Sequence, residues 1–124
     1  MSEEIKDKTV GILAYVTLIG FIIAIIMNND KEGKEKQFGA FHLRQSLGLI
    51  IVGIGLYIAT AIISAIFLAI GSFFGVIVSL LTSVLSLGFI GFIILGIVNA
   101  SNGEKKELPI IGSYISKLLK NTFD

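Results

Sequence analysis

The chain has 124 residues, of which 54% are hydrophobic, and it carries a formal net charge of only +1. Its mean hydropathy of +0.90 is far above that of a soluble domain, so the composition predicts an integral membrane protein with a single domain over 1–124. The absence of cysteine excludes a disulfide framework, a thiol nucleophile and cysteine-based metal ligation.

The first apolar segment, 9–27, has 19 residues without a charge, which is about the length of one membrane crossing. The tail before it opens with two acidic residues, so we expect no cleaved signal peptide. The following segment, 28–40, mixes charges of both signs around Gly33, which is typical of a solvated connection.

The segment 37–46 brings aromatic rings, the sole histidine and an arginine together directly before the next apolar run. We expect it to lie at the membrane interface, with Phe38 and Phe41 toward the acyl chains while His42 and Arg44 reach the headgroups. An ordinary basic anchor at the membrane boundary explains this pattern, and a functional polar site is the alternative.

The run from Gln45 to Gly103 contains 59 consecutive residues without Asp, Glu, Lys, Arg or His. This length predicts two further crossings, 47–70 and 76–99, with a turn at 71–75. Three crossings within the same run would leave about 18 residues each and almost no turns, so we reject a four-crossing chain.

Small and polar residues recur at helical spacing along both of these crossings. On one helix such a stripe allows close packing against another, with the hydroxyls bonded across the interface or to their own helix. A hydroxyl-lined conduit is the alternative. The predicted packing stripe comprises Gly53, Tyr57, Thr60, Ser64, Gly75, Ser79, Ser83 and Ser86.

The C-terminal segment 109–123 opens with Pro109, after a turn in which Gly103 suits a helix end. Its apolar positions recur at helical spacing but span too few residues to cross the membrane, so we expect an interfacial amphipathic helix, or else a docking face for a partner helix. The predicted fold is therefore an all-α membrane protein with three transmembrane helices and this interfacial helix.

The basic residues decide the predicted orientation. With three crossings, 8 lysine and arginine residues fall on the side of the 28–45 loop and the C-terminus, and 2 fall on the other side. The positive-inside rule then places the N-terminus outside and the C-terminus in the cytoplasm, where the basic side favours anionic lipid headgroups.

The sequence offers little for catalysis or for a cofactor. No carboxylate lies within a predicted crossing, and one histidine without cysteine cannot build a metal or haem site by itself. No glycine signature for binding phosphate follows a strand, and nothing further supports nucleic-acid binding. We therefore expect no enzyme activity, no cofactor, no nucleic-acid partner and no small-molecule substrate.

Two motifs resemble the small bacterial membrane proteins of the DUF4870 family, which is grouped with the Tic20-like proteins. The first motif is an aromatic-His-x-Arg-Gln entry to a crossing, and the second closes a crossing with Asn-Ala-x-x-Gly-Glu and a Pro-x-Ile-Gly turn. The resemblance covers about 9–118. Its residues are Phe41, His42, Arg44, Gln45, Asn99, Ala100, Gly103, Glu104, Pro109, Ile110 and Gly112.

The resemblance implies an accessory or channel-like subunit of a membrane protein-transport assembly, with other membrane subunits or further copies as partners. The Tic20 pattern has four crossings, whereas three are expected here. A non-transporting scaffold or lipid-associated structural protein, acting through its cytoplasmic-side amphipathic segments, is the alternative. In both cases we expect a polar cluster at the cytoplasmic interface, with Glu104 and Arg44 as an ion pair. The cluster comprises His42, Arg44, Gln45, Asn99, Asn102 and Glu104.

Overall fold

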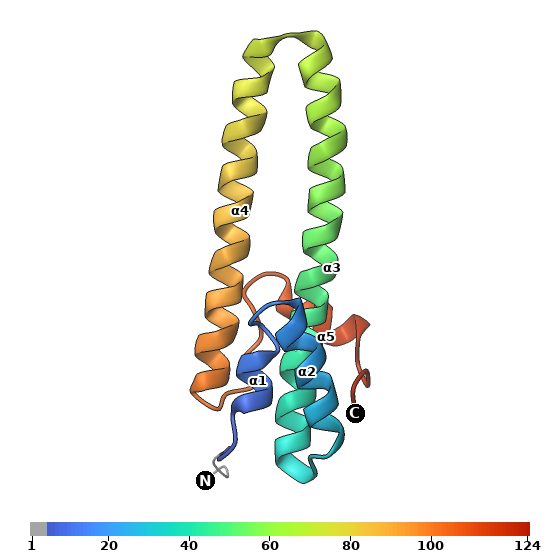
Figure 1. The fold of residues 1–124 in the computed structure, drawn as a ribbon, viewed down its shortest axis with the longest axis vertical. Helices are drawn as coiled ribbons and strands as arrows, with labels where there is room; N and C mark the ends of the chain where they lie inside the picture. Colours follow the sequence, from blue (N-terminus) through green and yellow to red (C-terminus); the bar gives the residue numbers. More distant parts are fainter. Residues whose placement is uncertain (1–4) are drawn as a thin grey trace. The chain divides into compact units, whose positions relative to one another are not determined.

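The computed structural model describes residues 5–124, and within this range the chain is all-α (Figure 1). It forms two compact units. We call the described residues up to Leu49 together with Phe92–Asp124 the polar unit, and Ile50–Gly91 the hairpin unit. The helices are α1 (Thr9–Leu13), α2 (Leu18–Asn29), α3 (Gly33–Ile70), α4 (Ser72–Ser101) and α5 (Gly112–Leu118).

The hairpin unit consists of the second part of α3 and the first part of α4, which run antiparallel (Figure 1). Gly71 alone separates the two helices, and its carbonyl accepts a hydrogen bond of 3.2 Å from the Phe74 N–H. The segments 47–70 and 76–99, which were predicted to cross the membrane, lie within α3 and α4, and both helices are long and apolar enough to cross a membrane.

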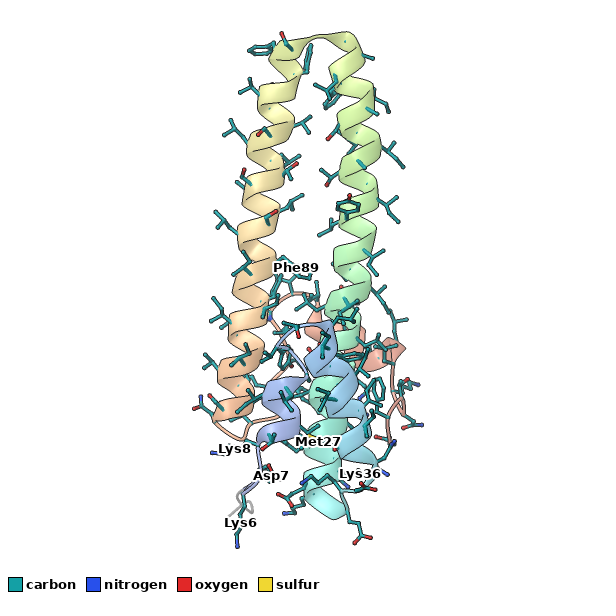
Figure 2. The ribbon with its side chains drawn as sticks, in the orientation of Figure 1. Lys6, Asp7, Lys8, Met27, Lys36 and Phe89 are labelled. Carbon is teal, nitrogen blue, oxygen red and sulfur yellow. The ribbon has the colours of Figure 1, made fainter. Side chains whose placement is uncertain are left out.

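The exposure of the hairpin unit is the reverse of that expected in water. Large apolar side chains point outward along both helices; for example, Ile54 is 57% exposed, Leu80 is 65% exposed and Val84 is 65% exposed. Figure 2 shows side chains made mostly of carbon projecting from both helices of the hairpin unit. Moving one such side chain from water into an apolar environment is favourable by on the order of 1.5–3 kcal/mol, so this surface belongs in lipid. The chain is therefore a membrane protein.

The first apolar segment differs from its prediction. Instead of one helix over 9–27, the chain forms α1 of 5 residues and α2 of 12 residues, each shorter than a crossing. Thr17 separates them: its φ is +92°, and its side-chain oxygen accepts a hydrogen bond from the Gly20 N–H, which caps α2. Tyr15, between the two helices, is buried. Three transmembrane helices are therefore not confirmed.

The segment 37–46 is the beginning of α3 rather than a separate surface segment. Phe38 is 1% exposed and His42 is 0% exposed, so both side chains lie inside the polar unit instead of reaching outward. The Phe38 ring fits over Gly11 of α1, where a β-carbon would come within 2.7 Å of the ring. The charged connection is correspondingly shorter than the predicted 28–40, because α3 already begins at Gly33.

The C-terminal helix is also shorter than predicted. α5 covers Gly112–Leu118 instead of 109–123. Ile115 is buried against Gly48 of α3, where an added β-carbon would lie 2.4 Å from the Ile115 side chain. Ile110 and Leu118 are each 83% exposed. This segment therefore uses one apolar side chain to dock on α3 and leaves others outside.

Candidate functional site

The polar unit is built around His42, which lies on α3 and joins two distant segments. Its Nδ1 atom is 2.8 Å from the Tyr15 hydroxyl, and its Nε2 atom is 2.7 Å from the Glu104 backbone oxygen. A carbonyl only accepts, so Nε2 carries the proton and donates it, while Nδ1 accepts from Tyr15. Burial lowers the pKa of His42 to about 4, so the ring is neutral near pH 7, and both ring nitrogens are bonded within the fold.

The end of α4 places the Glu104 carbonyl for this bond. Gly103 follows α4 with a φ of +72°, a conformation that glycine adopts without strain. The Gly103 N–H donates to Ala100 O at 2.9 Å, and the Glu104 N–H donates to Asn99 O at 3.0 Å, so these two carbonyls near the end of α4 are satisfied. The prediction that Gly103 ends a helix is confirmed.

Gln45 lies one turn after His42 and holds the C-terminal segment. Its Nε2 atom donates to Gly112 O at 3.0 Å and to Ser116 Oγ at 3.0 Å. Its Oε1 atom accepts from the Leu108 N–H at 3.1 Å. Gln45 is 0% exposed; its bonds to Gly112 and Leu108 are buried, and its bond to Ser116 is partly buried. This side chain ties the loop and α5 to the beginning of α3.

Three further polar side chains hold backbone groups in the same unit. Asn99, 8% exposed, donates to Lys106 O at 3.3 Å. Asn28, 2% exposed, donates to Lys36 O at 3.2 Å, and its Oδ1 atom has no hydrogen-bond partner among the described residues. Ser46 donates to Ala14 O. The polar interior of this unit therefore consists mainly of side chains that bind main-chain atoms.

Arg44 has a different partner from the predicted one. Its Nη1 atom donates to Asp124 Oδ1 at 2.8 Å and to Thr122 O at 3.2 Å. The expected ion pair between Arg44 and Glu104 is wrong, because Arg44 pairs with Asp124. Glu104 instead contributes its backbone oxygen, which accepts a hydrogen bond from His42. Asn102 is exposed just after α4. Of the predicted cluster, the structure connects His42 with Glu104 and leaves Arg44 and Asn102 outside it.

A second ion pair joins the N-terminal segment to the α2–α3 connection. Lys31 Nζ lies 2.6 Å from Asp7 Oδ2. The hydrogen bond from Lys31 and those from Thr9 lower the pKa of Asp7 to about 2. The Asp7 N–H also donates to Glu35 Oε2 at 2.9 Å. These contacts fix the charged end of the polar unit, where Figure 2 labels Asp7.

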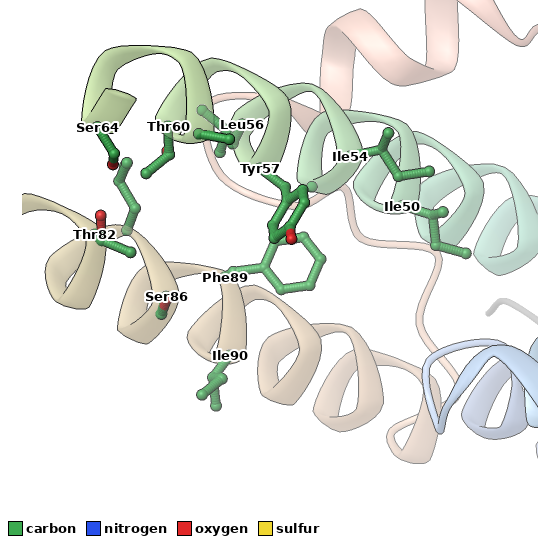
Figure 3. A pocket seen from close by; sticks show the side chains of 13 residues that line it. Ile50, Ile54, Leu56, Tyr57, Thr60, Ser64, Thr82, Ser86, Phe89 and Ile90 are labelled. Atoms are coloured by element: carbon green, nitrogen blue, oxygen red, sulfur yellow. The ribbon is translucent and has the colours of Figure 1, made fainter. Parts of the chain in front are cut away.

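The predicted packing stripe is only partly at the helix contact in the hairpin unit. Gly53, Tyr57, Thr60, Ser64 and Ser86 line an open groove of about 790 Å³ between α3 and α4. In Figure 3 the Tyr57 and Phe89 rings project into this groove from the facing helices. A β-carbon at Gly53 would lie 2.6 Å from the Phe89 ring, so this glycine makes room for Phe89.

The serines of α4 mostly lie beside this contact. Ser79 and Ser83 are exposed, and the Ser83 hydroxyl donates to Ser79 O of its own helix at 2.9 Å. Gly75 meets Leu68 near the turn, where an added β-carbon would be 3.1 Å from that side chain. The face of α4 that is covered instead carries Val78, Thr82, Leu85 and Phe89.

Sequence reasoning missed several residues that build the site. Tyr15 lies in the segment predicted as the first crossing, and Asn28 lies at the start of the predicted solvated connection, yet both reach into the polar unit. The signal available in the sequence was that each is a hydrogen-bonding residue in or beside an apolar run. Within residues 5–124, no group of three or more His, Cys, Asp or Glu side chains is arranged to hold a metal ion.

Comparison with known proteins gives one family. Residues 6–115 match the model of the MamF/MmsF family, described as the magnetosome magnetite crystal formation protein family. No curated protein and no solved structure matches the chain. The family match overturns the resemblance to the DUF4870 and Tic20-like proteins, which is wrong, and the transport role that it implied has no support.

Proposed function

The chain belongs to the magnetosome magnetite crystal formation protein family, and we propose that it serves crystal formation as a non-enzymatic scaffold of the magnetosome membrane. The observation that carries this proposal is the contrast between the two units. Apolar side chains are exposed in the hairpin unit and also on α2 of the polar unit, for example at Ile19 and Ile26. The hairpin unit has no charged residue, whereas the polar unit contains a hydrogen-bonded interior and all the charged residues. The first unit anchors the chain, and the second is available to lipids and proteins at the surface.

In this proposal only α3 and α4 cross the membrane. Two crossings return the chain to the side from which it started, so both ends of the chain lie on one side. All 10 lysine and arginine residues occur before Gln45 or after Gly103. The positive-inside rule then places them together in the cytoplasm, in contrast to the three-crossing prediction, which placed the N-terminus outside.

This topology limits what can reach the opposite side of the membrane, where an enclosed crystal would grow. The turn at Gly71 is followed by Phe73 and Phe74, and it contains no charged side chain. Magnetite surfaces are ionic, and this turn offers them no carboxylate or ammonium group. The protein therefore acts on the crystal through the membrane and its assemblies, by recruiting lipids, further copies of itself or other membrane proteins.

The polar unit has no catalytic step in this proposal. Both ring nitrogens of His42 and the amide group of Gln45 are bonded to other parts of the same chain. These bonds support a role in holding the loop and α5 on α3. A cofactor, a nucleic acid and a small-molecule substrate likewise have no part in the proposed function.

Complementation in a magnetite-forming bacterium that lacks its own member of this family tests the proposal. We expect the wild-type chain to restore crystal size and number, measured by electron microscopy. The Ser72→Ala variant should restore them as well, because the turn makes no contact with mineral. The Gln45→Ala variant should not, because it disrupts the polar unit. Failure of wild-type rescue, or loss of rescue by Ser72→Ala at normal protein levels, would contradict the scaffold role.

A further inference from the structure

A basic pocket of about 760 Å³ lies in the polar unit, on a face of α3 that does not carry the buried side chains of His42 and Gln45. Gly33, Gln37, Phe41 and Arg44 follow one another at helical spacings of four, four and three residues, so they lie on one side of α3. The loop after α4 and the segment after α5 complete the wall. The lining residues are Gly33, Lys36, Gln37, Phe41, Arg44, Lys105 and Asp124.

The charges of this wall favour an anion. Lys36, Arg44 and Lys105 are positive, and Asp124 is the one acidic residue among the lining residues. Within the described residues, the ammonium groups of Lys36 and Lys105 have no hydrogen bond or ion pair. Three cations from two separate segments, α3 and the loop after α4, therefore surround one space, and the carboxylate of Asp124 neutralises only part of their charge.

Arg44 already binds a carboxylate in this pocket, and this contact shows how its guanidinium group would bind another anion. Its side chain is 15% exposed, and its Nη1 atom already holds the carboxylate of Asp124 at 2.8 Å. A guanidinium has five N–H donors, and the two contacts at Nη1 leave those on Nε and Nη2 without a partner in the described chain. A partly buried guanidinium group can donate two parallel hydrogen bonds to two oxygens of a phosphate group.

We propose that this pocket binds a phosphate-bearing anion, with Arg44 as the bidentate donor and Lys36 and Lys105 as charge partners. Asp124 occupies part of the pocket as an internal competitor that the anion displaces from Arg44. Two sources could present this chemistry, a phospholipid headgroup or a soluble phosphate ester. The inference goes beyond the scaffold role and depends on it only for the membrane placement that favours the lipid source.

The position of Arg44 along α3 favours a lipid. Arg44 is the last charged residue before the charge-free run that begins at Gln45, so an anion bound to it lies at the depth where α3 enters the membrane. Phospholipid phosphates occupy that depth. Phe41 adds an apolar wall, and its ring can border the glycerol and upper acyl chains of a bound lipid.

Native mass spectrometry of the full-length protein in a neutral detergent tests the pocket. The probes are phosphatidylglycerol, phosphatidylethanolamine with the same acyl chains, and glycerol 3-phosphate. We expect phosphatidylglycerol to bind more tightly than phosphatidylethanolamine. Lys105→Gln should weaken phosphatidylglycerol binding about tenfold, which is the loss of one charge-assisted hydrogen bond. Asp124→Asn should strengthen binding, because it removes the competing carboxylate.

Lys106→Gln is the matched control, because Lys106 is adjacent in sequence but does not line the pocket. Its affinity should equal that of the wild type. Tight glycerol 3-phosphate binding that depends on Lys105 would retain the phosphate site and assign it to a soluble ligand. Equal losses in Lys105→Gln and Lys106→Gln, or equal binding of the two lipids, would overturn the proposal. These binding measurements do not depend on crystal formation, so a failure of the pocket proposal can be distinguished from a failure of the scaffold proposal.

Discussion

Replacing Gln45 with alanine is expected to release the segment 108–116 from α3 and to destabilise the polar unit by on the order of 3 kcal/mol. The reason is that the change removes the hydrogen bonds of one side chain to three groups of this segment. They are the Leu108 N–H, the Gly112 carbonyl and the Ser116 hydroxyl. Each buried polar group that loses its partner costs about 1–3 kcal/mol unless water reaches it.

Hydrogen exchange of the full-length protein in lipid nanodiscs measures this effect. Amides of 108–116 should exchange faster in Gln45→Ala, while amides of 56–64 in the hairpin unit should keep their wild-type rates. Gln37→Ala is the matched control, because Gln37 lies on the same helix and is exposed. Unchanged exchange at 108–116 in Gln45→Ala would show that the three hydrogen bonds do not hold this segment.

Replacing Gly96 with alanine is expected to destabilise the polar unit by about 2–4 kcal/mol, the sum of overpacking and a lost hydrogen bond. A β-carbon at this position would lie 2.3 Å from Cε1 of the Tyr15 ring. Tyr15 is 5% exposed and is held by His42, so its ring cannot move aside without breaking the hydrogen bond to Nδ1. One methyl group on α4 thus disturbs α3 and the α1–α2 connection together.

Gly88→Ala provides the comparison on the same helix. Nothing lies within 4 Å of a β-carbon at Gly88, so this change should be neutral or stabilising by up to about 1 kcal/mol through helix propensity. Thermal unfolding in detergent, followed by the near-ultraviolet circular dichroism of the tyrosines, should show a lower midpoint for Gly96→Ala alone. Equal midpoints for the two variants would mean that Tyr15 does not pack on Gly96.

The long helices could be predicted from sequence because the membrane dictates their composition. A charge-free run of 59 residues has few arrangements other than two spanning helices, and Gly71 lies where the turn was expected. The segment 9–27 has the same hydropathy signature, but its break depends on the cap at Thr17 and on burial of Tyr15. These are tertiary effects that hydropathy does not report.

The candidate site was predictable in part for a related reason. His42, Gln45, Asn99 and Glu104 were expected together because the ends of two adjacent crossings meet on one side. Their partners could not be predicted, because most are backbone atoms, such as the oxygen of Gly112, which lies 67 residues after Gln45. The stripe on α4 was misplaced because Phe89 over Gly53, not serine, forms the helix contact. Short motifs also pointed to the wrong family.

The most direct test of the two-crossing scaffold is the sidedness of its ends. The chain has no cysteine, so single variants Lys6→Cys, Ser72→Cys and Ser113→Cys can be labelled with a membrane-impermeant maleimide in inverted and right-side-out membrane vesicles. All three wild-type residues are exposed. We predict that Lys6→Cys and Ser113→Cys react only in inverted vesicles and Ser72→Cys only in right-side-out vesicles. Labelling of Lys6→Cys and Ser113→Cys from opposite sides would require a third crossing and would contradict the account.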